Sequence, residues 1–378
     1  MENSLSPTAS TSPTASTSQA LQVDMAAIEQ ELTHFWSDPE APEVETPVTR
    51  ACMANLVIFC RNTVEEREIT REIPLIVAQH PSRVLLLVAD AHSQSEGLEA
   101  FVKAHRRLIE EGQQIYSEHV TVRAGSVGIR RLPSTVRSLL LGDLATALWW
   151  ATPEAPPLFG TLCDELAELA DQVIYDSVAW TDPLHQLIVT ANWVGRGHAK
   201  ISADLAWRRP RLWRRLIAQS LDPAYAPGAL EGITDIYIEH GPHALTQAWL
   251  LIGWLALRLG WQPRGGRVAP GPEVHWQFAW PHGTPQVRIR RLTSGAAEIN
   301  TLRVVTRVAG QPVTFHFRAE SATRVGVFAE GFGDRMLSLA GPVQSRAEMV
   351  ARQLPDLARD RLFEESVALA RTMAEAVL

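Results

Sequence analysis

The side chains best suited to binding chemistry lie in one segment, residues 204–215, where five arginines stand close to two tryptophans. Arginine offers a planar fork of donors to carboxylates and phosphates and stacks on indole rings. Arginine and tryptophan are also enriched at the energetic centres of protein interfaces. The candidate partner-binding residues here are Asp204, Trp207, Arg208, Trp213 and Arg214. The alternative is that both tryptophans belong to a core while the arginines cover the surface.

Two adjacent tryptophans, Trp149 and Trp150, are the second candidate. They end a short apolar run that is typical of a strand, and ligands and partners meet a parallel sheet at the carboxyl ends of its strands. We therefore add both to the partner-binding hypothesis. A rival interpretation is an enzyme or sensor that binds a phosphorylated small molecule at this edge of the α/β sheet through Arg208 or Arg214.

A metal site could be built from Asp235, Glu239, His240 and His243, because carboxylates and imidazoles at short spacing can converge on zinc. Their order is not H-E-x-x-H, and Gly241-Pro242 interrupts any helix that would align them. The pattern favours turn and helix-start residues, and we predict no metal.

Catalytic and cofactor motifs also fail. Ser126 lacks the first glycine of a nucleophile elbow, and Cys163 lies among acidic residues that would raise its pKa. The run 195–202 has Ala199 where a phosphate loop needs glycine, and no G-x-G-x-x-G follows a predicted strand. We expect no catalytic residue and no cofactor.

Composition indicates a globular chain of roughly two or three domains, with 378 residues, 46% of them hydrophobic. The formal net charge of −7 opposes general nucleic-acid binding, which needs a phosphate-neutralising surface. All but two of its 35 basic residues are arginine. Most of these arginines are expected on solvated faces.

Cellular placement follows from what the chain lacks. Cys52, Cys60 and Cys163 do not form a disulfide framework, which suggests a reducing compartment. Residues 1–19 lack the basic and apolar regions of a secretory signal, and the most lipid-like run, 244–260, is interrupted by Gln247 and Arg258. We expect a cytoplasmic protein without a membrane segment.

The chain divides into three predicted parts. Residues 1–46 form a disordered Ser/Thr/Pro tail, a short helix over 22–36 and a linker. Residues 47–226 form an α/β domain with a mostly parallel sheet and crossover helices. Residues 227–378 form an α+β domain with an antiparallel meander of strands and C-terminal helices.

The strongest local pattern is a strand–helix–strand unit over 53–60, 63–79 and 83–89. The stretch 132–177 shows the same alternation of helices and apolar strands. Five short alternating runs over 274–329 predict the meander. Residues 96–112 fit either a helix or a strand, and their periodicity favours the helix.

Several stretches together resemble one family, the OpcA glucose-6-phosphate dehydrogenase assembly proteins known from cyanobacteria and actinobacteria. They include the motifs His80-Pro81-Ser82-Arg83 and Val173-Ile174-Tyr175-Asp176-Ser177. The other stretches are 46–56, 113–118, 133–134, 143–144, 148–150, 204–207, 213–219 and 254–261. Their order and spacing carry the resemblance over about residues 46–261.

The resemblance implies a non-catalytic protein that binds glucose-6-phosphate dehydrogenase. It implies an allosteric activator that promotes the enzyme's active oligomer and raises flux into the oxidative pentose phosphate pathway. It also implies a β-hairpin over 98–108 and 113–123, against the periodicity. The resemblance also links this effect to thioredoxin in cyanobacterial relatives, which keeps thioredoxin as a possible partner, but no cysteine follows Cys163 here, which argues against a C-terminal redox switch.

Overall fold

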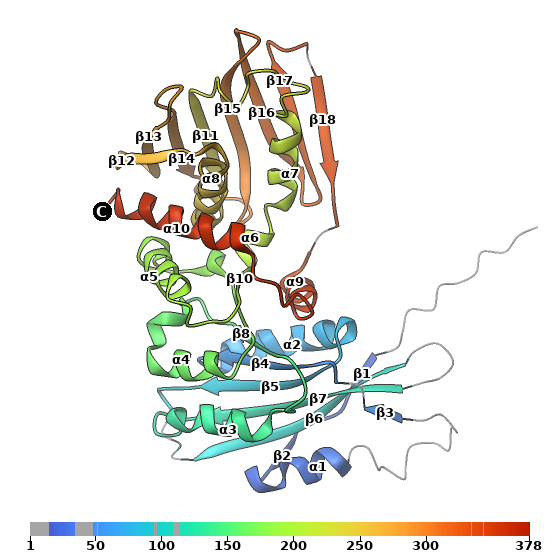
Figure 1. Ribbon diagram of the computed structural model, residues 1–378. Coiled ribbons are helices and arrows are strands. Elements are labelled where there is room, and N and C mark those ends of the chain that lie inside the picture. The colour runs from blue at the N-terminus through green and yellow to red at the C-terminus, as the bar shows by residue number, and fades with distance from the viewer. Residues whose placement is uncertain are drawn as a thin grey trace, which may run out of the picture. The chain divides into compact units, whose positions relative to one another are not determined.

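The computed structural model describes residues 15–34, 48–50, 52–93, 95, 97–108, 114–333, 335–342 and 344–378. The chain separates into two compact units, residues 1–146 and 147–378 (Figure 1). The expected boundary between residues 226 and 227 stays a prediction. Most of the expected tail and linker, residues 1–14 and 35–47, lies outside the described residues.

The first unit is built on a sheet with strand order β1-β6-β7-β5-β4, in which β2 also pairs with β6 and β3 with β7. Its strands are β1 (Ala15–Thr17), β2 (Leu21–Val23), β3 (Val48–Arg50), β4 (Ala54–Cys60), β5 (Ser82–Ala89), β6 (Leu98–Leu108) and β7 (Gln114–Ala124). Strands β3, β4, β5 and β7 run parallel, whereas β6 is antiparallel to β7. Every residue of β4 and β5 is buried, as their continuous apolar runs predict.

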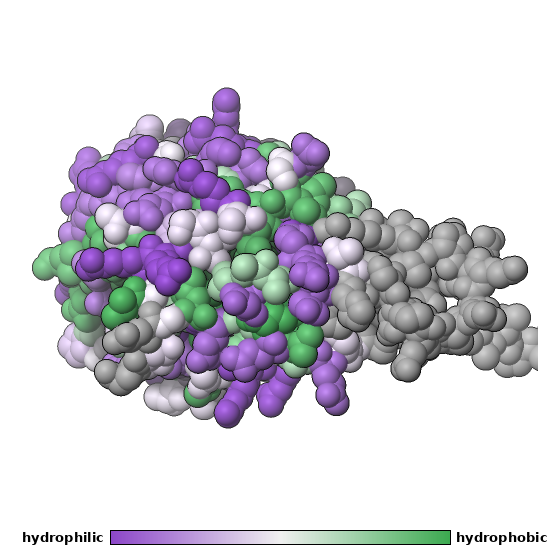
Figure 2. All heavy atoms as spheres, turned by 90° about the horizontal axis from the view of Figure 1, so that it is seen from below, coloured by the Kyte–Doolittle hydropathy of each residue, from purple (hydrophilic) through white to green (hydrophobic). Residues whose placement is uncertain are grey.

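Three helices cover this sheet. Helix α2 (Thr63–Gln79) joins β4 to β5 and begins at Asn62, whose side chain accepts the amides of Val64 and Glu65. The predicted strand–helix–strand unit is therefore confirmed. Figure 1 shows α2 on one face of the sheet, and α1 (Ile28–His34) and α3 (Leu132–Leu139) on the other. Figure 2, which views the α1 side, shows hydrophobic and hydrophilic side chains interspersed over that face.

The helix favoured by periodicity over 96–112 is wrong, and the hairpin implied by the family resemblance is confirmed. Strand β6 pairs with β7 from Leu98 opposite Ala124 to Leu108 opposite Gln114. The alternation of period two prevails because Ala100, Val102 and Ala104 are buried on one face of the sheet.

The N-terminal predictions are corrected in part. The helix expected over 22–36 begins later, since Leu21–Val23 is a strand paired with β6 and the α-helix starts at Ile28. Residues Ala15–Thr17, placed in the disordered tail, also form a strand, paired with β6. A long edge strand with unpaired backbone groups explains why this polar segment orders.

The second unit opens with three parallel strands, β8 (Thr146–Trp150), β9 (Gln172–Tyr175) and β10 (Ser202–Asp204). Helix α4 (Thr161–Glu168) connects the first two strands, and helix α5 (Pro183–Gly195) connects the last two. The predicted mostly parallel α/β architecture is confirmed. Two short helices follow, α6 (Leu205–Arg208) and α7 (Arg211–Ser220).

The rest of this unit is an eight-stranded sheet with order β12-β13-β14-β11-β15-β16-β17-β18. Its strands are β11 (Asp235–His240), β12 (Gln262–Ala269), β13 (Glu273–Ala279), β14 (Gln286–Arg291), β15 (Ile299–Val308), β16 (Gln311–Ser321), β17 (Arg324–Glu330) and β18 (Arg335–Ala340). The predicted antiparallel meander is confirmed. β11 enters its middle, parallel to β14 and antiparallel to β15.

Helices α8 (Leu245–Leu259), α9 (Arg346–Gln353) and α10 (Arg361–Glu375) complete the unit. Helix α8 is apolar around most of its circumference because it packs against α10, α6 and β11. Among the described residues, no helix combines the length and apolar character needed to cross a bilayer.

Candidate functional site

Asp204 joins the second unit's parallel strands to its arginine-rich helices. It ends β10 and caps α6, where its Oδ1 accepts the amide of Ala206 at 2.9 Å. Ser177 donates its hydroxyl to Oδ2 at 2.6 Å and its amide to Oδ1 at 3.1 Å. Burial raises the pKa of Asp204 to about 7, although the bonds from Ser177 act to lower it. The Asp204 carboxylate therefore stabilises the interior of the unit and is not an exposed contact residue.

Trp207 and Arg214 form the centre of a cluster that links α6, α7 and the start of α10. The Trp207 Nε1 donates to Asp360 Oδ2 at 2.8 Å, and the Arg214 guanidinium lies 3.8 Å above the indole ring. Arg214 Nη1 also donates to the carbonyl of Trp207 at 2.7 Å. Burial lowers the pKa of Arg214 to about 10. Trp213 is buried as well, so these three predicted contact residues mainly hold the helices together.

Arg208 lies at the edge of this cluster, and its Nη2 pairs with Asp356 Oδ2 at 2.6 Å. With Asp204, Trp207 and the segment around Asp356 and Asp360 it lines a pocket of about 330 Å³. Its neighbour Arg209 makes two hydrogen bonds of 2.6 Å to Asp176. Of the predicted residues in this segment, Arg208 is the one whose charged group lines an open pocket and also a neighbouring groove.

Trp149 and Trp150 lie at the carboxyl end of β8, as predicted, but their side chains are only 0% and 1% exposed. Arg346 lies over the Trp149 ring at 5.4 Å, and Phe159 meets Trp150 edge-on at 5.0 Å. Both rings belong to the interior and neither offers an accessible stacking surface. The structure therefore does not bring them into one exposed site with Arg208.

Sequence reasoning missed an arginine-lined groove of about 370 Å³. Arg211 and Arg215 of α7 line it, together with Arg324 at the start of β17 and Arg352 at the end of α9. The run of arginines in α7 was a visible signal. No local pattern could have added Arg324 and Arg352, which come from more than 100 residues further along the chain.

Three of the four candidate metal ligands have other hydrogen-bond partners. Asp235 accepts from Arg288 at 3.0 Å, and Glu239 accepts from Tyr237 and Thr301. His240 is buried with Nδ1 2.7 Å from the carbonyl of Gly241, and burial lowers its pKa. Within the part of the chain that the structure describes, no three His, Cys, Asp or Glu side chains are grouped so as to hold a metal ion.

Two of the three cysteines, Cys60 and Cys163, are poorly placed for nucleophilic or redox chemistry. Cys60 and Cys163 are buried. Burial and the neighbouring Asp164 raise the pKa of Cys163 to about 12, and burial also raises the pKa of Cys60. The reactive thiolate is therefore scarce at neutral pH at both positions.

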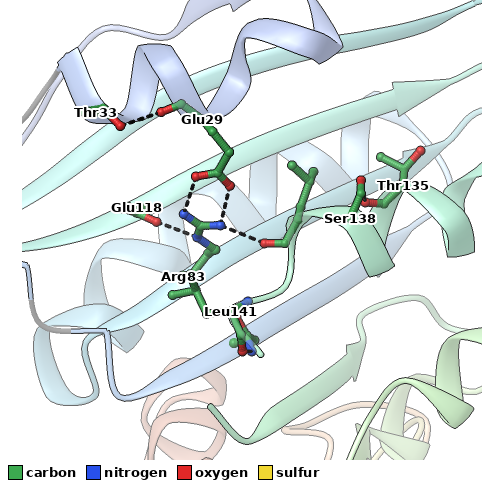
Figure 3. Close-up of polar contacts among 9 residues, drawn as sticks. Glu29, Thr33, Arg83, Glu118, Thr135, Ser138 and Leu141 are labelled. Carbon is green, nitrogen blue, oxygen red and sulfur yellow. Dashed lines mark hydrogen bonds and ion pairs between the residues drawn. The ribbon is translucent and has the colours of Figure 1, made fainter. Parts of the chain in front are cut away.

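In the first unit, residues from two stretches that carry the family resemblance meet around Arg83 (Figure 3). Arg83 Nε donates to Glu118 Oε2 at 2.5 Å, and its Nη1 donates to Glu29 Oε1 at 2.6 Å and to the carbonyl of Leu139 at 2.8 Å. Burial acts to lower the pKa of Arg83, but the two carboxylates outweigh it and the pKa is raised. The arginine therefore stays charged and ties α1 and α3 to the sheet.

Asn55 also stabilises the interior of the first unit through buried hydrogen bonds. Its Nδ2 donates to the carbonyls of Leu141 and Leu144, and its Oδ1 accepts the amide of Leu141. The buried amide thus fixes the loop that follows α3. Like Arg83 and Glu118, it lies in a stretch that carries the resemblance and is internal to the fold.

Comparison with known proteins shows which protein family the chain resembles. A family model described as the glucose-6-phosphate dehydrogenase subunit N-terminal domain matches residues 74–192, and one described as the C-terminal domain of the same subunit matches residues 200–367. A relative from Synechocystis sp., named as the OxPP cycle protein OpcA, is 29% identical over 314 residues, or 78% of this chain and 64% of that protein. The OpcA relative from Nostoc punctiforme is 32% identical over 191 residues, or 50% and 40% of the two chains.

The matched regions span less than two thirds of the length of either relative. A solved structure, a dehydrogenase from Chromobacterium violaceum, covers 87% of this chain and 95% of its own at 11% identity, with a TM-score of 0.49. That likeness is too low to carry an argument. The two family models match successive parts of the chain, and together with the relatives they confirm the resemblance: the chain belongs to the OpcA family.

Proposed function

We propose that this protein is a non-catalytic assembly factor that binds glucose-6-phosphate dehydrogenase and promotes its active oligomer in the oxidative pentose phosphate pathway. The observation that carries the proposal is the match to two family models, both named for a subunit of that dehydrogenase, over successive parts of the chain. Activation through a changed oligomer is an allosteric effect, since binding at one surface alters a distant active site.

The chemistry of the candidate residues supports a binding role. Asp204, Trp207 and Arg214 are committed to one another and to neighbouring helices, and the thiols of Cys60 and Cys163 have raised pKa values. Ser177 donates to Asp204 at 2.6 Å, but both residues are buried and the carboxylate also caps α6, so this pair is not accessible as the nucleophile and base that covalent catalysis needs. The surface around α6 and α7, where Arg208 remains partly exposed, is the proposed docking region.

The rival function, an enzyme or sensor for a phosphorylated small molecule at the Trp149–Trp150 edge, has less support. It needs accessible rings and a free guanidinium, but both rings are buried. Arg214 is stacked on Trp207, and Arg208 is paired with Asp356.

The test is a kinetic titration of the cognate dehydrogenase with the purified protein. We expect a saturable fall in the KM for glucose 6-phosphate, or a rise in kcat, at a fixed stoichiometry. The protein alone is expected to turn over neither glucose 6-phosphate nor NADP⁺. Turnover by the protein alone, or dehydrogenase kinetics that stay unchanged at a large excess, would refute the proposal.

A further inference from the structure

Two pairs of arginines line the arginine-lined groove and are called its two walls: one pair lies on α7, and the other pair comes from β17 and α9. Arg211 and Arg215 lie one helical turn apart on α7, so both project from the same face of that helix. Arg324 and Arg352 line the groove from the start of β17 and the end of α9. All four side chains are exposed, so the groove is open to solvent.

These charges are largely unneutralised. Among the described residues, Arg211, Arg215 and Arg352 have no carboxylate within 4.0 Å, and Arg324 reaches Glu320 only at 4.0 Å. Glu298 is the carboxylate that lines the groove with these four arginines; Arg208 and Arg209 also line it but are paired with Asp356 and Asp176. The chain as a whole carries a net charge of −7, so this groove is a local positive field on an acidic protein.

The floor of the groove is apolar. Leu212, Trp213, Val325 and Met349 line it, and all but the partly exposed Leu212 are buried. Gly341 and Pro342 also line the groove, and a Cβ added to Gly341 would lie 3.2 Å from Leu212 Cδ1. The apolar floor and the cationic walls together suit a peptide whose carboxylates contact the arginines and whose apolar side chain packs on the floor.

This combination distinguishes an acidic peptide from a small phosphorylated molecule. A small phosphate ligand is normally held by convergent, ordered donors, whereas these arginines are exposed and come from three separate elements. A peptide with alternating acidic and apolar residues satisfies both walls and also covers the floor. An acidic segment is repelled by the rest of an acidic chain, so the groove would also set its position.

We infer that this groove binds an acidic segment of the dehydrogenase, a conclusion that rests on the proposed function for the identity of the partner. Arg211, Arg215, Arg324 and Arg352 hold its carboxylates, and the floor over Val325 and Met349 receives an apolar side chain.

The test compares two charge-reversed forms of the full protein. Arg211→Glu/Arg215→Glu reverses one wall, and the matched control Arg264→Glu/Arg267→Glu reverses two exposed arginines of β12, outside the groove, with the same change of net charge. Binding is measured to the cognate dehydrogenase and to a short fluorescein-labelled peptide that alternates glutamate and leucine. We expect the groove variant to bind both about tenfold more weakly or worse, and the control to stay within about twofold.

A second variant guards against misfolding, since Arg324→Glu/Arg352→Glu reverses the other wall without changing any residue of α7. Loss of binding in both groove variants, with unchanged circular dichroism, supports the inference. Dehydrogenase binding that is equal in wild type and both variants overturns the inference, while the proposed function stands.

Two further results separate the claims. If the wild type binds the peptide through the groove but does not bind the dehydrogenase at all, the proposed function fails and acidic-segment recognition stands. If inorganic pyrophosphate binds at micromolar concentration and the peptide does not, the groove is a small-anion site and the inference is overturned.

Discussion

Arg83 and Glu118 form an ion pair of 2.5 Å in which the two side chains are only 2% and 0% exposed. They lie on neighbouring parallel strands, β5 and β7, one residue before the paired residues Val84 and His119. Both residues belong to stretches that carry the family resemblance. Part of that resemblance therefore comes from residues that stabilise the fold, not from residues that contact a partner.

Replacing Arg83 with methionine should destabilise the first unit by about 3–5 kcal/mol, because the carboxylate of Glu118 is left buried without its cation. Urea unfolding followed by circular dichroism measures the change. The double variant Arg83→Met/Glu118→Leu should recover much of the loss, since no buried charge remains.

The exposed member of the same cluster provides the control. Glu29 is 55% exposed and its charge is well hydrated, so Glu29→Gln should cost about 1 kcal/mol or less. A loss from Glu29→Gln as large as that from Arg83→Met would contradict this division of roles.

Trp207→Phe should reduce stability by about 1 kcal/mol, because it removes the hydrogen bond to Asp360 while leaving an aromatic ring beneath Arg214. Affinity for the dehydrogenase should change by less than about twofold, since the ring is internal. Isothermal titration calorimetry checks this expectation. A large loss of affinity in a stably folded Trp207→Phe protein would make Trp207 a direct contact.

Two buried histidines should make the first unit less stable in acid. Thr17, His105, His119 and Thr121 form a chain of contacts at 3.0–3.1 Å, and it needs an acceptor nitrogen between the two rings. Burial, followed by the charge of Lys103, lowers the pKa of His105 to about 4, and burial lowers that of His119.

An unfolded histidine titrates near pH 6.5. Between about pH 6.5 and 4, His105 is therefore protonated in the unfolded chain but stays neutral in the folded protein. Stability therefore falls as pH drops through this window, by about 3 kcal/mol from His105 alone. His105→Gln should reduce this slope in urea unfolding measured from pH 7.5 to 4.5, and His119 should contribute part of the slope that remains. The exposed His92→Gln should keep it.

Thiol labelling should distinguish Cys52 from the other two cysteines. Cys52 is partly exposed, whereas Cys60 and Cys163 are buried and their thiols have raised pKa values. Ellman's reagent at neutral pH should modify one thiol of the native protein and three in denaturant. Rapid modification of Cys163 in the native protein would contradict this prediction and would make Cys163 a candidate redox-sensitive residue.

The sequence predicted the elements whose local signals were consistent. Helix α2 and strand β15 have the predicted bounds, because a strand–helix–strand pattern and a long alternating run each favour one structure. Strand β6 was wrongly expected to be a helix because its alanines fit both periods, and only pairing with β7 decides between them. Strands β12 and β18 were missed, since glycine, proline and the position at a sheet edge weaken the strand signal.

The candidate site was less predictable than the fold. Residue type alone could not reveal that Trp149, Trp150 and Trp213 face the interior, because an apolar anchor and a core residue have the same composition. The groove brings Arg211 and Arg215 together with Arg324 and Arg352, which depends on how α7 and α9 meet the second sheet. Such long-range placement leaves no trace in local spacing.

The central claim is that this protein acts by binding the dehydrogenase and changing its assembly. Sedimentation velocity of the fluorescently labelled dehydrogenase, at the dilute concentrations used in activity assays, measures this directly. On adding the unlabelled protein, we expect the label to move into a larger species that contains both proteins and the higher dehydrogenase oligomer. A sedimentation profile that stays the same at saturating protein would contradict the account.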